Sequence, residues 1–203
     1  MGNENTYEFL VGAPEQSASA SVGILVYIEL EKNNIPEESL VAIGKGRELG
    51  DMLGTGVGAI AVDSRIEKYA EDVFHAGADK LLIPDNTEIQ KYDPELYRNF
   101  VTQAISKIEP EVFLLPMSAH IRDFIPRVAQ RAETGLISGC IAIDLDTTDR
   151  IVLVTRPAYG EKMHEIYTCA AARPQMILLM PSTFPLPIMD DFRSGTTEKI
   201  MLS

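Results

Sequence analysis

The chain has 203 residues, 45% of them apolar, which suffices for one large domain with its own core. Its formal charge of −12, from 18 Lys and Arg against 30 Asp and Glu, disfavours binding to nucleic acid or anionic lipid. The sequence shows no signal-peptide pattern in residues 1–21 and no apolar run near the roughly 18 residues of a membrane span. We therefore expect a cytoplasmic protein without membrane insertion.

The first two thirds of the sequence alternate short apolar runs with helical patterns. Residues 1–21 are small and polar, and they are expected to form an N-terminal extension. Strands are expected at 22–28, 57–62, 79–84 and 111–116, and helices at about 40–52, 65–75, 94–108 and 120–132. Strands that are apolar throughout are typical of a parallel sheet covered on both faces, so the pattern predicts an α/β, Rossmann-like open sheet.

The last third has a different rhythm. Four β-like segments, at 138–145, 150–158, 163–170 and 175–180, follow one another without helices between them. Short turns join them, which predicts an antiparallel β addition to the same sheet. The Pro-rich residues 181–187 are expected to be extended, and residues 185–203 to form a linker or tail.

Neither a catalytic triad nor a metal site can be assembled from the sequence. Cys140 and Cys169 have no Cys-x-x-Cys spacing, and we expect two buried, inert thiols in a reducing compartment. His75, His120 and His164 have no ligand spacing to a cysteine or carboxylate. We therefore expect a protein that is not an enzyme.

A glycine-rich stretch, residues 54–58, might bind phosphate or might simply end a helix. Phosphate loops follow a strand and open a helix, whereas this stretch follows a helix and enters a strand. The sequence therefore favours a helix C-cap with close backbone packing.

One candidate binding edge follows the fourth predicted strand. It carries Ser118, Arg122, Asp123 and Arg127. In open α/β sheets ligands and partners gather at the carboxyl ends of the strands, and a helix N-terminus with arginines suits an anionic group. The alternative is that Asp123 and the arginines only form local salt bridges.

A second group of candidate interface residues lies at other strand ends. Thr155, Arg156 and Tyr159 close one predicted strand, and Arg173 precedes the last one. Arginines at strand ends of an acidic protein are candidates for a partner interface, and ion pairing inside the domain is the competing interpretation.

These segments resemble the alpha subunit of electron-transfer flavoproteins over about residues 22–184. Residues 121–129 (IRDFIPRVA) are similar to the family's GRDLAPRVAA helix, and residues 155–160 (TRPAYG) to its TRPAFGG segment. Residues 173–176 (RPQM) match a segment of the same letters, and 43–49 and 76–80 resemble the family's GKARELA and YGADKV segments.

The resemblance implies that residues 22–184 are the first domain of an alpha subunit, with an adenine-nucleotide alpha-hydrolase-like fold. This domain would pair with a beta subunit, and residues 185–203 would lead toward a second domain that binds FAD. The Gly-rich flavin segments of that second domain are not in this sequence, so FAD is implied in the complete heterodimer rather than on this chain alone. AMP or FAD is implied in the beta subunit, and acyl-CoA-type and other flavin-dependent dehydrogenases are the implied electron donors.

Two alternatives stay open from the sequence. The chain could be a stand-alone adenine-nucleotide-binding module of the stress-protein type, because that class has the same architecture. It could also be a short paralogue that serves only as a scaffold.

Overall fold

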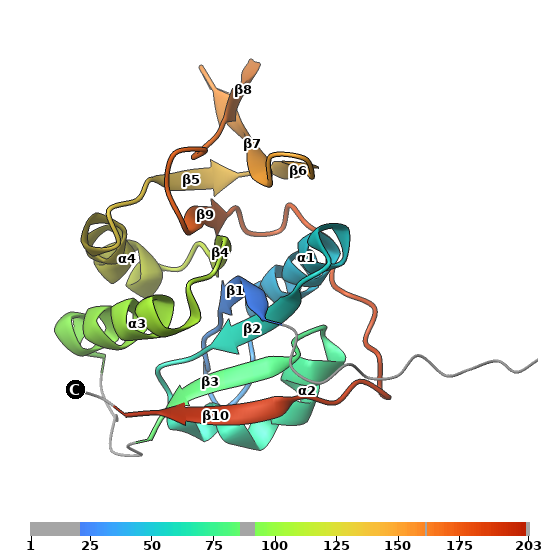
Figure 1. The fold of residues 1–203 in the computed structure, drawn as a ribbon, viewed down its shortest axis with the longest axis vertical. Coiled ribbons are helices and arrows are strands. Elements are labelled where there is room, and N and C mark those ends of the chain that lie inside the picture. The colour runs from blue at the N-terminus through green and yellow to red at the C-terminus, as the bar shows by residue number, and fades with distance from the viewer. Residues whose placement is uncertain (1–20, 86–91, 161, 202–203) are drawn as a thin grey trace, which may run out of the picture.

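The computed structural model describes residues 21–85, 92–160 and 162–201 (Figure 1), so the expected extension lies outside them apart from its last residue. Within these residues the chain forms a seven-stranded sheet, a three-stranded sheet and helices. The strands of the large sheet are β1 (Val22–Tyr27), β2 (Gly56–Ile60), β3 (Lys80–Pro84), β4 (Val112–Pro116), β5 (Leu136–Cys140), β9 (Gln175–Leu179) and β10 (Thr196–Ile200). The small sheet comprises β6 (Ala142–Asp146), β7 (Ile151–Ala158) and β8 (Met163–Tyr167). The helices are α1 (Glu37–Leu53), the 3₁₀ helix η1 (Ser64–Tyr69), α2 (Ala70–His75), α3 (Pro94–Ile108) and α4 (Ala119–Arg131).

The large sheet confirms the predicted α/β fold. Its strand order is β10-β3-β2-β1-β4-β9-β5, and each neighbouring pair is parallel. The chain builds outward from β1 through β2 and β3, then starts again at β4 on the other side of β1. The order therefore reverses between β1 and β4. Open α/β sheets place their ligands at the carboxyl ends of the strands at such a reversal, which we call the switch point.

Helices cover both faces of the large sheet, with α1 and α2 on one face and α3 and α4 on the other (Figure 1). Alternate residues of β1 serve the two layers: Ile24 and Val26 belong to the core under α1 and α2, and Leu25 and Tyr27 to the core under α3 and α4. This double burial explains why the strands are continuous apolar runs.

Helix α1 lies very close to the sheet because of its glycines. A Cβ on Gly46 would lie 2.7 Å from Cγ2 of Val26, so only glycine allows this approach without a shift. The helix runs past Gly50 and ends at Leu53, and its C-cap residue Gly54 has a left-handed φ of +66°. The interpretation of this glycine-rich stretch as a C-cap is thereby confirmed.

The helix expected at 65–75 begins instead with a 3₁₀ segment. Asp63, and not the neighbouring Ser64, is the N-cap: its carboxylate accepts a 2.9 Å hydrogen bond from the Arg65 N–H. The Ile66 N–H donates to the Asp63 carbonyl in the i to i+3 pattern of a 3₁₀ turn. Regular α-helix starts only at Ala70.

The antiparallel strands form a sheet of their own, contrary to the expectation that they extend the large one. Short connections join β6 to β7 and β7 to β8, and these pairs are antiparallel. Strands β5 and β9 instead run parallel inside the large sheet, because the chain between them, residues 141–174, is long enough for a crossover. We call β6, β7 and β8 the arm, since β7 and β8 project beyond the large sheet (Figure 1).

The expectation of a linker or tail over 185–203 is wrong for residues 196–200. After β9 the chain crosses α1 and α2 (Figure 1) and enters β10, which pairs with β3. The Thr196 N–H donates to the Asp79 carbonyl (3.1 Å), and Nζ of Lys80 lies 3.1 Å from Glu198 on β10. We call residues 180–195 the strap.

Candidate functional site

The first turns of α4 hold the four predicted residues of the switch-point edge. Ser118 caps the helix, and its Oγ accepts a 3.2 Å hydrogen bond from the Ile121 N–H. The Tyr92 hydroxyl donates to Asp123 at 2.7 Å. Asp123 is therefore tied to its own domain.

The two arginines of this edge differ. Arg127 Nη1 lies 3.2 Å from Glu95 of α3, which is the local ion pair that the alternative interpretation expected. Arg122 is exposed and makes no side-chain hydrogen bond or ion pair within the part of the chain that the structure describes. Only Arg122 keeps its charge available to a partner.

A carboxylate that the sequence analysis missed lies beside this edge. Glu29 follows β1, its side chain is 19% exposed, and its Oε1 lies 3.8 Å from Nδ1 of His120. Burial raises the pKa of Glu29, and the hydrogen bond with Ser118 and the charge of His120 only partly oppose that effect. A charged residue directly after a buried strand was the signal that could have found it.

The same edge bears two more carboxylates, Glu37 and Glu38, in the first turn of α1. Both residues are exposed, and no side-chain cap precedes them at Pro36. Negative charge at this helix N-terminus and at Glu29 opposes a phosphate group. The switch point of this chain is therefore chemically unsuited to a nucleotide phosphate.

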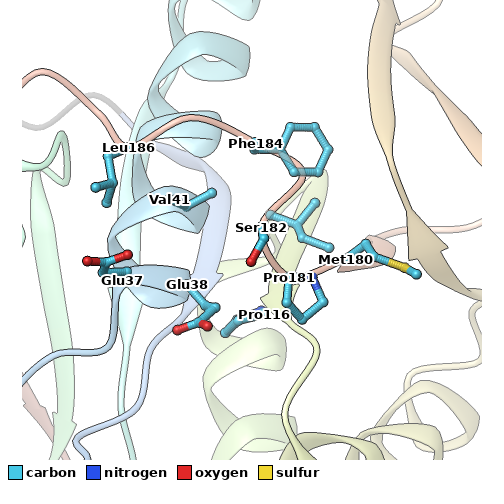
Figure 2. A pocket seen from close by; sticks show the side chains of 10 residues that line it. Glu37, Glu38, Val41, Pro116, Met180, Pro181, Ser182, Phe184 and Leu186 are labelled. Carbon is cyan, nitrogen blue, oxygen red and sulfur yellow. The ribbon is translucent and has the colours of Figure 1, made fainter.

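A hollow of about 80 Å³ opens between this first turn of α1 and the strap (Figure 2). Its walls include the apolar side chains of Val41, Pro116 and Leu186, and the carboxylates of Glu37 and Glu38 lie at its border. The lining suits an apolar group attached to a cation.

The arm carries Thr155, Arg156 and Tyr159. The Thr155 carbonyl accepts the Ile141 N–H at 3.0 Å, which joins β7 to the start of the arm. The guanidinium of Arg156 lies 5.0 Å from the ring centre of Tyr167, a cation–π contact that holds it flat on the arm. Tyr159 is 74% exposed in the connection after β7.

Further large apolar side chains of the arm are exposed: Met163, Ile166 and Tyr167. Ile166 is 68% and Met163 57% exposed, both on β8. The sequence analysis named the arginine and tyrosine of this hairpin but not these apolar neighbours. β7 and β8 pair Arg156 with Glu165 and Thr155 with Ile166, so Arg156, Met163 and Tyr167 lie on one face of the hairpin and Ile166 lies on the other. Aromatic, methionine and arginine side chains are enriched at protein interfaces.

Arg173 lies at the opposite, amino-terminal edge of the large sheet, before β9. Its guanidinium donates to backbone carbonyls, including that of Arg150 at 3.1 Å. Gln175 is buried, and its side chain makes two hydrogen bonds with the backbone at the start of β7. Its Oε1 accepts the Val152 N–H at 2.8 Å, and its Nε2 donates to the Arg150 carbonyl at 3.0 Å. This segment thus fastens β7 to β9.

An ion pair between Arg150 and Glu111 also connects the start of β7 to the large sheet. Nε and Nη2 of Arg150 each lie 2.5 Å from an oxygen of Glu111, in a bidentate pair. These hydrogen bonds lower the pKa of Glu111 below its ordinary value. The two groups of predicted residues lie in three places, the α4 edge, the arm and the opposite edge of the sheet, because Arg173 is separated from Thr155, Arg156 and Tyr159.

The described residues hold no group of three His, Cys, Asp or Glu side chains placed to bind a metal ion. Both cysteines are free, but only Cys140 is buried, and burial raises its pKa to about 12; Cys169 is half-buried. In the same ranges, each helix is too short or too polar to cross a membrane.

Comparison with known proteins gives a consistent result. A family model described as "Electron transfer flavoprotein domain" matches residues 24–203. The electron transfer flavoprotein subunit alpha of Clostridium acetobutylicum is 32% identical over 83% of this chain and 50% of its own length. Protein FixB of Clostridium saccharobutylicum is 32% identical over 80% of the chain and 48% of its own length.

A third relative is named as part of a dehydrogenase. Subunit LctC of the Acetobacterium woodii lactate dehydrogenase (NAD(+),ferredoxin) is 29% identical over 81% of this chain and 39% of its own length. The chain spans about half the length of the curated relatives it matches.

Proposed function

Because the chain belongs to the electron transfer flavoprotein family, on the alpha-subunit side, we propose that it is the structural, partner-binding part of such a subunit. In this role it pairs with a beta subunit to build a heterodimeric, FAD-containing electron carrier. It is a carrier component and not an enzyme, and we expect the assembly to work in the cytoplasm.

The observation that carries the proposal is the position of residues 155–160. This segment, which resembles the family's TRPAFGG, runs out along β7 to the exposed end of the arm. Tyrosine and arginine are the residue types that most often dominate binding energy at interfaces. Tyr159, Arg156 and Tyr167 are thus the arm residues best suited to contact the beta subunit.

FAD is expected to lie outside this chain's own switch point. Dinucleotides bind this class of sheet with their pyrophosphate on a helix N-terminus at the reversal of strand order. Here that place bears Glu29, Glu37 and Glu38, which do not fit a pyrophosphate. The residues described therefore supply scaffold and interface, with FAD in the complete heterodimer and AMP or FAD in the beta subunit.

For the electron donor we propose a class of proteins and not an individual enzyme. A flavin-dependent dehydrogenase is the partner implied by the family, and acyl-CoA-type dehydrogenases are the leading candidates. The relative from Acetobacterium woodii is named as a lactate dehydrogenase subunit, so the donor class includes dehydrogenases of hydroxy acids.

The test is the affinity of the chain for the beta subunit of the same organism, measured by isothermal titration with three variants. Arg156→Ala and Arg122→Ala should each weaken binding by about tenfold or more, because truncating a hot-spot residue costs about 2 kcal/mol or more. Lys68→Ala, on the exposed η1 helix, should leave the affinity unchanged. Equal affinity of all three variants would rule out this assignment of the interface.

A further inference from the structure

A second exposed apolar surface, separate from the arm, lies on the strap. Ile188 is 97% exposed and Phe192 94% exposed, and Leu186 and Met189 are exposed by 52% and 40%. Contiguous apolar surface of this kind on a folded chain marks a site of interaction.

The backbone that presents these side chains is held against the helices at several points. Cβ of Pro187 lies 2.7 Å from where a Cβ on Gly44 of α1 would stand, so the two backbones are in close contact. The Asp190 N–H donates to the His75 carbonyl at 2.9 Å. Arg193 Nη1 lies 2.9 Å from Oδ1 of Asp79. The apolar side chains are therefore exposed on a backbone that is already held in place. Binding of a partner would not have to pay the entropy of ordering this segment.

Carboxylates accompany the apolar side chains along the strap. Asp190 and Asp191 stand between Met189 and Phe192, and the Asp191 side chain is 85% exposed. Glu37 and Glu38 border the hollow beside Leu186 (Figure 2).

The cations that adjoin the strap do not balance this charge at the surface. Lys45, Arg47 and Arg193 have side chains only 15%, 17% and 30% exposed, and each is paired with a carboxylate. Nδ1 of His75 lies 3.9 Å from Oδ1 of Asp191, whereas Glu37, Glu38 and Asp190 form no ion pair among the residues that the structure describes. The exposed face thus combines apolar side chains with an excess of negative charge. Such a face attracts positive partners and repels anionic ones.

We propose that the strap face, made of Leu186, Ile188, Met189 and Phe192 with Glu37, Glu38, Asp190 and Asp191, docks a basic segment of a partner protein. An apolar side chain of that segment enters the hollow between Val41 and Leu186, and its Lys or Arg side chains lie against the four carboxylates. Charge complementarity selects this occupant over a second copy of the chain, because each copy carries a formal charge of −12. The inference goes beyond the arm and does not depend on the beta-subunit assignment.

The experiment uses two fluorescent peptides of identical leucine spacing, one with lysine and one with glutamate at the remaining positions. Fluorescence anisotropy with the full chain should show binding of the lysine peptide and not of the glutamate peptide. Ile188→Ser/Phe192→Ser should weaken lysine-peptide binding about tenfold or more, because the contact area of two large apolar side chains is lost. Glu37→Gln/Glu38→Gln should weaken binding and reduce its dependence on salt.

The matched control is Met201→Ser, which removes an apolar side chain of 72% exposure at the other end of β10. It should bind the lysine peptide like the wild type, and circular dichroism should show that all variants stay folded. Equal affinity of the Ile188→Ser/Phe192→Ser variant and the wild type would overturn the proposal. Sedimentation showing that the strap variant abolishes a dimer of the chain would also overturn it, in favour of self-association.

Discussion

Asp79 is the residue on which the packing of α1, the strap and two strands converges. Its Oδ2 accepts hydrogen bonds from Arg47 Nη1 at 2.9 Å and from the Val57 N–H at 2.8 Å, and its Oδ1 accepts from Arg193 Nη1 at 2.9 Å. From the sequence, Asp79 is the first residue of a predicted strand and part of a segment that resembles the family's YGADKV. The sequence analysis could not predict the network, because Arg47 and Arg193 lie 32 and 114 positions away in the chain.

We predict that Asp79→Ala lowers the free energy of unfolding by about 2 kcal/mol, since it leaves an N–H and two guanidinium groups without their acceptor. Urea denaturation measures the change. Asp51→Ala removes only an exposed partner of the same Arg47 and should cost at most about 0.5 kcal/mol. Similar costs for both variants would contradict the central place given to Asp79.

Glu111 and Glu29 should affect the pH dependence of stability with opposite signs. The pKa of Glu111 is lowered by Arg150, so its contribution to stability is present above the ordinary value of 4.5 and is lost as pH falls through the folded value. Glu111→Gln should therefore be less stable than wild type at pH 7, and the gap should close in acid.

The pKa of Glu29 is raised by burial, so its favourable contribution exists below 4.5 and is lost as pH rises through the folded value. Glu29→Gln should therefore be more stable than wild type at pH 7, again with the gap closing in acid. Urea titrations at several pH values measure both differences. The same sign for both variants would refute the assigned causes.

At the scale of elements, the periodicity of α1 predicted a helix but not how closely it lies on the sheet. Its glycines are unfavourable to a helix in isolation, and the reason for them is visible only when Val26 of β1 is brought beneath Gly46. The spacing of apolar residues in the sequence predicts which face of the helix is buried. The distance between helix and sheet depends on the side chains of both elements, so it cannot be predicted from the helix alone.

We predict that Gly46→Ala destabilises the chain by up to about 2 kcal/mol, although alanine is the better helix former. Overpacking typically costs about 1–3 kcal/mol, against a propensity gain of at most about 1 kcal/mol. Thermal unfolding gives the sign. Met52→Ala, at an exposed position of the same helix, should be close to neutral, and a stabilised Gly46→Ala would show that α1 is free to move.

The strands after residue 135 show where sequence reasoning reaches its limit. The segment predicted at 138–145 is divided between β5 in the large sheet and β6 in the small one, and the other three segments each contain one strand. Local turns do not fix whether a segment pairs with its chain neighbour or returns to the large sheet. β9 is buried along its whole length, and that apolar run was the available signal of a parallel, central strand. β10 is mostly polar, and only its pairing with β3 makes it a strand.

At the scale of the whole molecule, the fold favours nucleotide binding at the switch point, whereas the charge around that point opposes it. The fold offers the place where nucleotides bind, and Glu29, Glu37 and Glu38 make that place acidic. The sequence allowed the prediction of the edge itself, from Ser118 onward. It could not show that carboxylates from α1 and from the segment after β1 gather there, because both segments are distant from Ser118 in the sequence.

We predict that millimolar AMP or ATP leaves the melting temperature of the chain unchanged. A ligand at about 100 times its Kd would add about 2.7 kcal/mol of stability, which differential scanning fluorimetry detects readily. A melting temperature that rises with nucleotide concentration would favour the stand-alone nucleotide-binding alternative.

The partner role is tested most directly by the mass of the complex formed with the beta subunit of the same organism. Light scattering after size-exclusion chromatography should show a 1:1 heterodimer, and the chain on its own should carry no visible flavin absorbance. A chain that stays alone beside its beta subunit, or that retains one flavin per chain without it, would contradict the account.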